Sequence, residues 1–217
     1  MKYEDIKDAK KYRYLFEEKD NQLKRFDMSA GYCIFIDGVK CTKYHNKDIL
    51  SENGFTKHIF DSIKEIMEKY NIECYIFAIL DEVSIIFPNS EKIENIFDVD
   101  CEELLLTKII SKFTLKFSEY DKCTFKGVIY KTSKGKENAI NIINYRRLVG
   151  MGTSMEYFAK EFLEKEKYIN KNSEELREVL KENGLLEKYE EKKFLYEGYM
   201  CELKDDFENI LDFLGIN

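Results

Sequence analysis

The 217-residue sequence has few of the residues that build the commonest protein metal sites and disulfide frameworks. It contains two histidines, which excludes a histidine-rich metal site, and its six cysteines form no Cys-x-x-Cys pair. Several of these cysteines stand inside apolar runs, where a free thiol behaves as a small hydrophobic side chain. The spacing therefore supports neither a zinc site nor a disulfide framework.

Long hydrophobic runs are also missing. No segment reaches the roughly 18 to 20 apolar residues that span a bilayer. The first twelve residues, MKYEDIKDAKKY, lack the apolar centre of a signal peptide. We therefore expect a soluble, cytoplasmic protein with no membrane partner.

Positive charge is in deficit, because 35 Lys and Arg residues face 42 Asp and Glu residues, for a formal net charge of −7. A protein that binds nucleic acid over its whole surface is usually basic. Any contact with a polynucleotide is therefore expected at a local patch. The 35% of charged residues and the single proline, Pro88, predict many helices with solvated faces.

The order of the apolar segments predicts an α+β fold. Six segments carry the pattern of a strand or a helix: strands at 32–36, 74–80, 83–87 and 125–130, and amphipathic helices at 56–70 and 105–117. This order, β-α-β-β-α-β, is the ferredoxin-like arrangement, an antiparallel sheet with helices on one face. The segment between the first strand and the first helix has the composition of a polar loop.

The chain beyond residue 136 has a helical pattern throughout. Asn172 and Glu175 resemble a capping pair, and Gly184 suits the far end of a helix over roughly residues 173–183. The length fits one domain. We expect a catalytic core with an N-terminal extension over residues 1–135, and a C-terminal helical region over residues 136–217 packed on it as one domain.

Acidic residues stand at the ends of the predicted strands. Asp37 follows the first strand, and Asp81-Glu82 lies between the second and the third. The first and third strands of this fold usually lie side by side, so these acids are expected at neighbouring strand ends. Carboxylates held that close repel one another, and a shared proton or a bound cation relieves the repulsion.

Hard oxygen ligands of this kind suit Mg²⁺, which completes its shell with water and substrate phosphates. Gly38 lets its own carbonyl, or a triphosphate, approach closely. Two such ions form a clamp for in-line phosphoryl displacement. A simpler explanation stays open, because Asp and Gly are typical turn residues and both acidic segments are also consistent with turns that bind no metal.

Several segments, read in order, make the chain resemble the tRNA-histidine guanylyltransferase family, whose members add nucleotides to RNA 5′ ends in the 3′-to-5′ direction. The resemblance spans roughly residues 30–200 at low identity. The segments are Asp37-Gly38, Phe55-Thr56-Lys57, Asp81-Glu82, Glu137-Asn138 and Ile143-Asn144-Tyr145-Arg146-Arg147. No single one is specific, and their order carries the resemblance.

The resemblance implies a palm sheet like that of ordinary polymerases. It implies two Mg²⁺ ions bound by Asp37, the backbone of Gly38 and Asp81, with Glu82 as the second acid of the acidic pair and a third catalytic residue. It implies GTP or ATP as substrates and RNA, with tRNA foremost, as the partner of a homotetramer or homodimer. The expected nucleotide-binding residues are Val39, Lys40, Cys41 and Thr42, whose backbone amides cradle the triphosphate, together with Lys57, Lys108 and Arg146.

The chain also departs from the family pattern. Phe35 stands where Arg or Lys is usual, and Leu80 stands where Ser is usual. Residues 151–154, Met-Gly-Thr-Ser, replace a His-Ile-Asn-Asn run that helps to select histidine tRNA. These departures favour a looser repair or elongation of RNA 5′ ends over addition to histidine tRNA alone.

Two other functions are consistent with the sequence. A palm-type nucleotide cyclase also carries an acidic pair on a β-hairpin, and a non-catalytic RNA-binding relative would tolerate the departures. A row of lysines at positions 108, 112 and 116 fits a phosphate track, although such a row is more often a solvated helix face.

Overall fold

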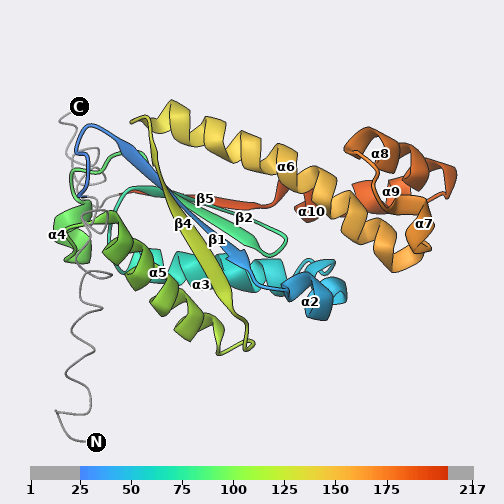
Figure 1. Cartoon of the computed structure of the whole chain (residues 1–217), viewed down its shortest axis with the longest axis horizontal. Helices are drawn as coiled ribbons and strands as arrows, with labels where there is room; N and C mark the ends of the chain where they lie inside the picture. Colours follow the sequence, from blue (N-terminus) through green and yellow to red (C-terminus); the bar gives the residue numbers. More distant parts are fainter. Residues whose placement is uncertain (1–24, 205–217) are drawn as a thin grey trace, which may run out of the picture.

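In the computed structural model, which describes residues 25–204, the chain forms a five-stranded antiparallel sheet in the order β4-β1-β3-β2-β5 (Figure 1). The strands are β1 (Gly31–Gly38), β2 (Cys74–Ile79), β3 (Glu82–Phe87), β4 (Phe125–Thr132) and β5 (Tyr199–Leu203). The first and third strands lie side by side, as the predicted topology requires. The expected N-terminal extension falls mostly on residues 1–24, outside the described residues.

Helices cover both faces of the sheet. The helices are α2 (Cys41–Ile49), α3 (Phe55–Glu68), α4 (Ile93–Phe97), α5 (Glu102–Phe117), α6 (Lys136–Phe162), α7 (Lys165–Tyr168), α8 (Ser173–Glu182), α9 (Leu186–Glu190) and α10 (Phe194–Glu197). Figure 1 shows α3 and α5 on one face, and the long α6 across the other. Beyond the sheet, α6 continues into the cluster formed by α7, α8 and α9.

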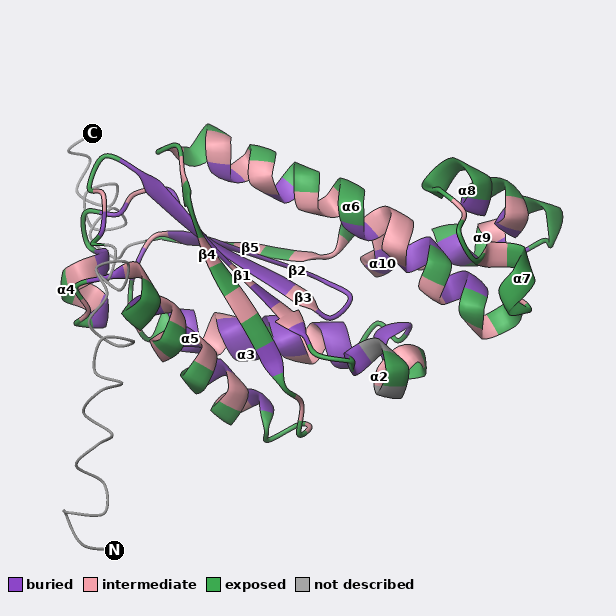
Figure 2. Cartoon of the chain, viewed as in Figure 1, coloured by how far each residue is buried: buried purple, intermediate pink, exposed green. Residues whose placement is uncertain are grey.

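The main core lies between the sheet and the pair α3 and α5, as Figure 2 shows. Alternate residues of β1, among them Tyr32, Ile34 and Ile36, are fully buried. Helix α5 turns Leu105, Ile109, Phe113 and Phe117 inward at helical spacing. Each such buried side chain contributes about 1.5 to 3 kcal/mol through removal of apolar surface from water.

The predicted α+β, palm-like fold is confirmed, and each of the six predicted elements is found within a few residues of its expected bounds. The capping pair is also confirmed: the Asn172 side chain accepts from the Glu175 amide, and the Glu175 carboxylate accepts from the Asn172 amide. Gly184 follows that helix with a positive φ of 65°. Within residues 25–204, no helix combines the length and apolar character needed to cross a bilayer.

Two expectations about secondary structure were wrong. Residues 199–203, expected to be helical, form edge strand β5, which pairs with β2 and alternates half-buried and exposed side chains. The expected polar loop after Gly38 is largely helix α2. Both elements are short, and their stability comes from packing against distant segments, so neither produces a long periodic pattern in the sequence.

Candidate nucleotide and metal site

The acidic residues meet at the end of β1, beside the hairpin that joins β2 to β3. Asp37 of β1 stands directly opposite Glu82 of β3. The Gly38 amide donates to the Asp81 carbonyl at 3.0 Å, which fixes the hairpin turn against β1. A Cβ at Gly38 would lie 3.2 Å from the Asp81 Cβ and 2.5 Å from the Cys41 sulfur, so only glycine fits this close approach.

The turn itself, Leu80-Asp81, holds a strained conformation. Leu80 has a φ of +56°, which is rare for a bulky residue and is sustained only where surrounding contacts impose it. The buried Thr56 hydroxyl, at the start of α3, donates to the Leu80 carbonyl at 2.7 Å. Both carbonyls of the turn are therefore held from outside the hairpin, one by α3 and one by β1.

Thr56→Val is expected to lower the free energy of unfolding by about 1 to 3 kcal/mol, because it leaves the buried Leu80 carbonyl without its donor at nearly constant volume. Urea unfolding measures the loss. Thr56→Ser, which keeps the hydroxyl, serves as the control and should retain most of the stability. Wild-type stability in Thr56→Val, with a loss in Thr56→Ser, would show that the methyl group, and not the hydrogen bond, supports the turn.

Burial and mutual repulsion shape the electrostatics of the three carboxyl groups. Burial and the neighbouring Asp37 raise the pKa of Asp81 from 3.8 to about 7. Burial also raises the pKa of Glu82, while the adjacent Arg146 opposes that rise. Asp37 is partly exposed and pairs with the Lys126 ammonium at 2.8 Å. The site thus holds more negative charge than its neighbours balance, which is the environment that attracts a cation.

Arg146, on α6, reaches the same site from the opposite face of the sheet. Its guanidinium forms an ion pair and hydrogen bond with the Glu82 carboxylate. It also lies over the Phe35 ring, 4.2 Å from the ring centre. Phe35 stands where the resemblance leads one to expect a basic residue, and its ring packs against Arg146 of α6. Arg146 in turn holds the Glu82 carboxylate in place.

The expected triphosphate cradle is the N-terminus of α2. Lys40 precedes this helix with a φ of +63°, and the first amides of a helix have no acceptor one turn before them. Such amides form an anion-binding nest. In this helix the Lys43 amide donates to the Lys40 carbonyl at 3.1 Å. The Val39 amide differs, because it donates to the Thr124 carbonyl at 2.8 Å. Cys41 is buried, and the side chain of Thr42 lies outside the described residues.

The two expected lysines lie in different places. Lys57 stands on the first turn of α3, next to Thr56, where it pairs with Asp61 and lies near the Tyr199 ring. Lys108 donates instead to the Phe97 carbonyl. Because Phe97 packs on Phe87, at the end of β3 remote from Glu82, the structure does not bring Lys108 to the carboxylates.

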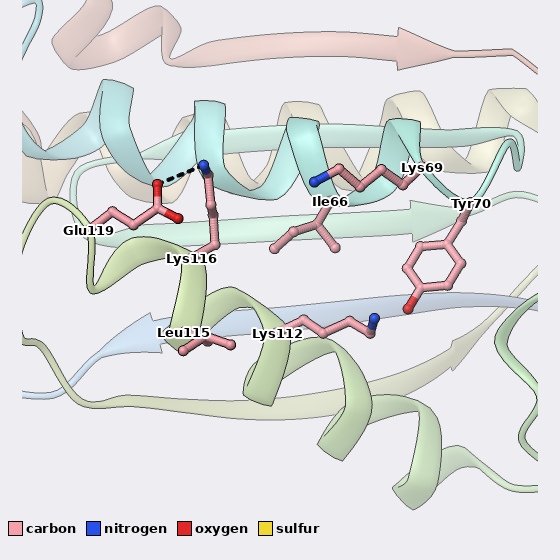
Figure 3. A pocket seen from close by; sticks show the side chains of 7 residues that line it. All are labelled: Ile66, Lys69, Tyr70, Lys112, Leu115, Lys116 and Glu119. Carbon is pink, nitrogen blue, oxygen red and sulfur yellow. Dashed lines mark hydrogen bonds and ion pairs between the residues drawn. The ribbon is translucent and has the colours of Figure 1, made fainter.

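Two lysines of the predicted row, Lys112 and Lys116, line a groove of about 400 Å³ between α3 and α5, together with Lys69 and Tyr70 (Figure 3). Lys116 forms ion pairs with Glu65 at 2.9 Å and with Glu119 at 2.8 Å. Lys112 lies over the Tyr70 ring. These partners balance much of the positive charge, so the groove is a mixed-charge helix surface.

Lys126 was absent from the sequence-based set of site residues. It stands opposite Asp37 in the β1–β4 pairing, so this pairing, once assigned, would have identified it. The partnership of Arg146 with Glu82 was also missed, because α6 approaches from a face that a β-α-β-β-α-β pattern leaves open.

An antiparallel sheet with one acid on a central strand and an acidic pair in the adjacent hairpin defines a polymerase-palm-like architecture. Comparison with solved structures agrees. A bacterial tRNA(His) guanylyltransferase (Thg1)-like protein in complex with ATP superposes with a TM-score of 0.63 at 16% identity, over 90% of this chain and 85% of that one.

Two further structures show the same likeness. A bacterial Thg1-like protein in complex with GTP gives a TM-score of 0.53 at 17% identity, over 80% of this chain and 75% of that one. The tRNA(His) guanylyltransferase from Saccharomyces cerevisiae gives 0.59 at 13% identity, over 88% and 92%. No family model and no curated protein matches the sequence. At these identities the comparisons show that the chain has the Thg1-like fold.

Proposed function

We propose that this protein is a nucleotidyltransferase that adds nucleotides to the 5′ end of RNA in the 3′-to-5′ direction. The observation that carries the proposal is the buried Asp81 beside Asp37, next to the N-terminus of α2, in a fold shared with structures solved with ATP and GTP. Paired acids and an anion-binding helix end are the two features that metal-dependent triphosphate chemistry requires.

The donor set fits Mg²⁺. Asp37 and Asp81 would hold the ions, with the Gly38 carbonyl as a further ligand, because hard carboxylate and carbonyl oxygens match this cation. The raised pKa of Asp81 supports the assignment, since a buried acid beside another acid gains most from a bound cation. When bound, two such ions activate an attacking hydroxyl and neutralise charge on the leaving phosphate.

The protein's own groups position the reactants. Thr56 and Gly38 hold the Leu80-Asp81 turn, and Arg146 holds Glu82, so the acids are fixed before substrate arrives. The α2 amides and Lys57 bind the nucleotide. Lys126 can leave Asp37 at little cost, because an exposed ion pair contributes only about 0 to 1 kcal/mol. No side-chain base is required in this scheme.

The proposed substrate is RNA, with tRNA foremost, because the structural neighbours include a tRNA(His) guanylyltransferase and two proteins like it. The acidic net charge supports a local contact over a broad basic surface. We further propose that the protein acts in the cytoplasm as a homo-oligomer. Exposed Val128 and Tyr130 of β4, with Tyr145 and Leu148 of α6, offer apolar surface for self-association.

An incorporation assay tests the proposal. The purified protein, Mg²⁺ and labelled GTP or ATP are incubated with tRNAs shortened at the 5′ end, and with no RNA. Extension of the RNA by labelled nucleotide is the expected result. A small labelled product formed without RNA would identify a cyclase, and RNA binding with no product would identify a non-catalytic relative; either outcome rejects the proposed transfer reaction.

A further inference from the structure

Three side chains with metal-binding atoms cluster beside the acidic site, and a fourth lies next to them; none of the four is a proposed Mg²⁺ ligand. The His45 Nε2 atom lies 3.2 Å from the Asp121 carboxylate and 3.5 Å from the Cys123 sulfur. Ligand atoms of these three residues all lie within 4.8 Å of one another. The Cys41 thiol lies near the Cys123 thiol but outside this group, and offers a fourth ligand atom.

The fold brings the four together from two short segments. Cys41 and His45 are four positions apart on α2, a spacing that places side chains on one side of a helix. Helical dihedral angles are interrupted at His45 itself. Asp121 and Cys123 are two positions apart in the segment between α5 and β4. No pair among these residues has the Cys-x-x-Cys spacing, so the spacing of ligands along the sequence does not predict this cluster.

We propose that Cys41, His45, Asp121 and Cys123 bind one Zn²⁺ ion. Two thiolates, an imidazole and a carboxylate form a four-ligand set that suits zinc and not Mg²⁺. Zinc–ligand bonds of about 2.0 to 2.3 Å in a tetrahedron place neighbouring ligand atoms about 3.3 to 3.8 Å apart. The nitrogen–oxygen and nitrogen–sulfur separations around His45 already match that spacing closely, so these three ligands require little rearrangement, while the Cys41 thiol has to move towards them.

The surroundings of the cluster fit a structural zinc ion. The His45 side chain is 19% exposed and that of Asp121 is 37% exposed, which leaves a route for the ion to enter. The His45 ring stacks on the Phe55 ring at 4.8 Å, which fixes its plane. A set of four protein ligands leaves no open position for substrate, so this ion would stabilise structure and take no part in chemistry.

The site would tie the start of α2 to the segment that leads into β4. Cys41 lies in the first turn of α2 and packs against Gly38, so a bound ion would hold the proposed triphosphate cradle in place. Zinc binding itself does not depend on the proposed transfer reaction. It can therefore succeed or fail as a proposal whether or not the protein incorporates nucleotides.

Cobalt binding tests the zinc site. The full chain is reduced, freed of metal with a chelator and titrated with Co²⁺ alone. One equivalent is expected to produce sulfur-to-cobalt charge-transfer bands and the intense visible bands of a tetrahedral site, and one equivalent of Zn²⁺ should then abolish them. Elemental analysis of protein purified without chelator should give one zinc per chain.

Variants locate the ion. Cys123→Ser and His45→Gln are expected to weaken Co²⁺ binding by at least tenfold, with circular dichroism confirming that each remains folded. Asp121→Asn provides a further folded variant should either fail that check. Cys201→Ser, on β5, and Asp37→Asn, in the acidic site, are the controls and should bind as the wild type does.

Absence of charge-transfer bands at stoichiometric Co²⁺ would overturn the proposal. Wild-type binding by folded Cys123→Ser and His45→Gln would overturn it too, because the ion would then lie elsewhere. Loss of binding in Asp37→Asn alone would place the metal at the acidic site and reject the separate zinc site.

Discussion

Asp37→Asn is expected to reduce Mg²⁺-dependent nucleotide incorporation by roughly a thousandfold or more. The substitution removes one anionic ligand from the two proposed Mg²⁺ ions. Metal ions contribute several kcal/mol of transition-state stabilisation, and about 1.4 kcal/mol corresponds to a factor of ten in rate. Asp37 is partly exposed at the end of β1, so the fold should survive the change. Single-turnover incorporation of labelled GTP into 5′-shortened tRNA measures the loss.

Asp27→Asn is the matched control. Asp27 also pairs with a lysine of β4, Lys131, as Asp37 pairs with Lys126. Asp27 lies towards the other end of the sheet, because Lys131 stands opposite Tyr32 in the β1–β4 pairing while Lys126 stands opposite Asp37. The control should keep the wild-type rate. A wild-type rate in Asp37→Asn would remove the metal mechanism.

Asp81→Asn is expected to make the metal-free protein more stable above neutral pH, although it removes a proposed catalytic residue. Asp81 has its pKa raised from 3.8 to about 7, so between these values the folded chain binds more protons than the unfolded chain. Stability from this group is full below pH 4 and is lost as the pH rises through 7. The shift corresponds to at most about 4 kcal/mol at pH 8, which the neutral amide would recover.

Chemical unfolding in a chelator, at pH 5 and at pH 8, measures this effect. The wild type should lose stability between the two values, and Asp81→Asn should lose less. Added Mg²⁺ should restore the wild type at pH 8 and leave the variant nearly unchanged. Asp27→Asn should show no gain, because hydrogen bonds from Lys131 and Ser29 lower the pKa of Asp27. A less stable Asp81→Asn at pH 8 would contradict the electrostatic account.

The fold was largely predictable because its central elements carry strong local patterns. The apolar run of β1 and the helical repeat of α5 are recognisable from the sequence alone. Because the first and third strands of such a fold usually pair, Asp37 is then expected beside the hairpin, where the structure has it. β5 and α2 escaped prediction. The alternation of half-buried and exposed residues in β5 covers only five positions, too few to indicate a strand within a helical region. Helix α2 follows Lys40, whose left-handed conformation matches no sequence pattern for a helix start.

The position of the acids at neighbouring strand ends was predictable, whereas the residues that contact them were less so. Periodicity places Lys108 on a helix but does not say towards which end of the sheet its ammonium reaches, and it reaches Phe97. The partnership of Arg146 with Glu82 depends on α6 crossing the second face, which no local pattern encodes. Long-range packing decides such contacts, so sequence spacing alone cannot supply them.

The pairing of β5 with β2 has a consequence for how the sheet is completed. β2 is buried along its whole length, and β5 covers the edge that β3 leaves free. The hydrogen bond from the Tyr75 hydroxyl to the Glu202 carboxylate joins positions 127 residues apart. During synthesis, the apolar edge of β2 therefore stays uncovered until α6 and the cluster beyond it have been made, and an uncovered strand edge of this kind can pair with another open strand.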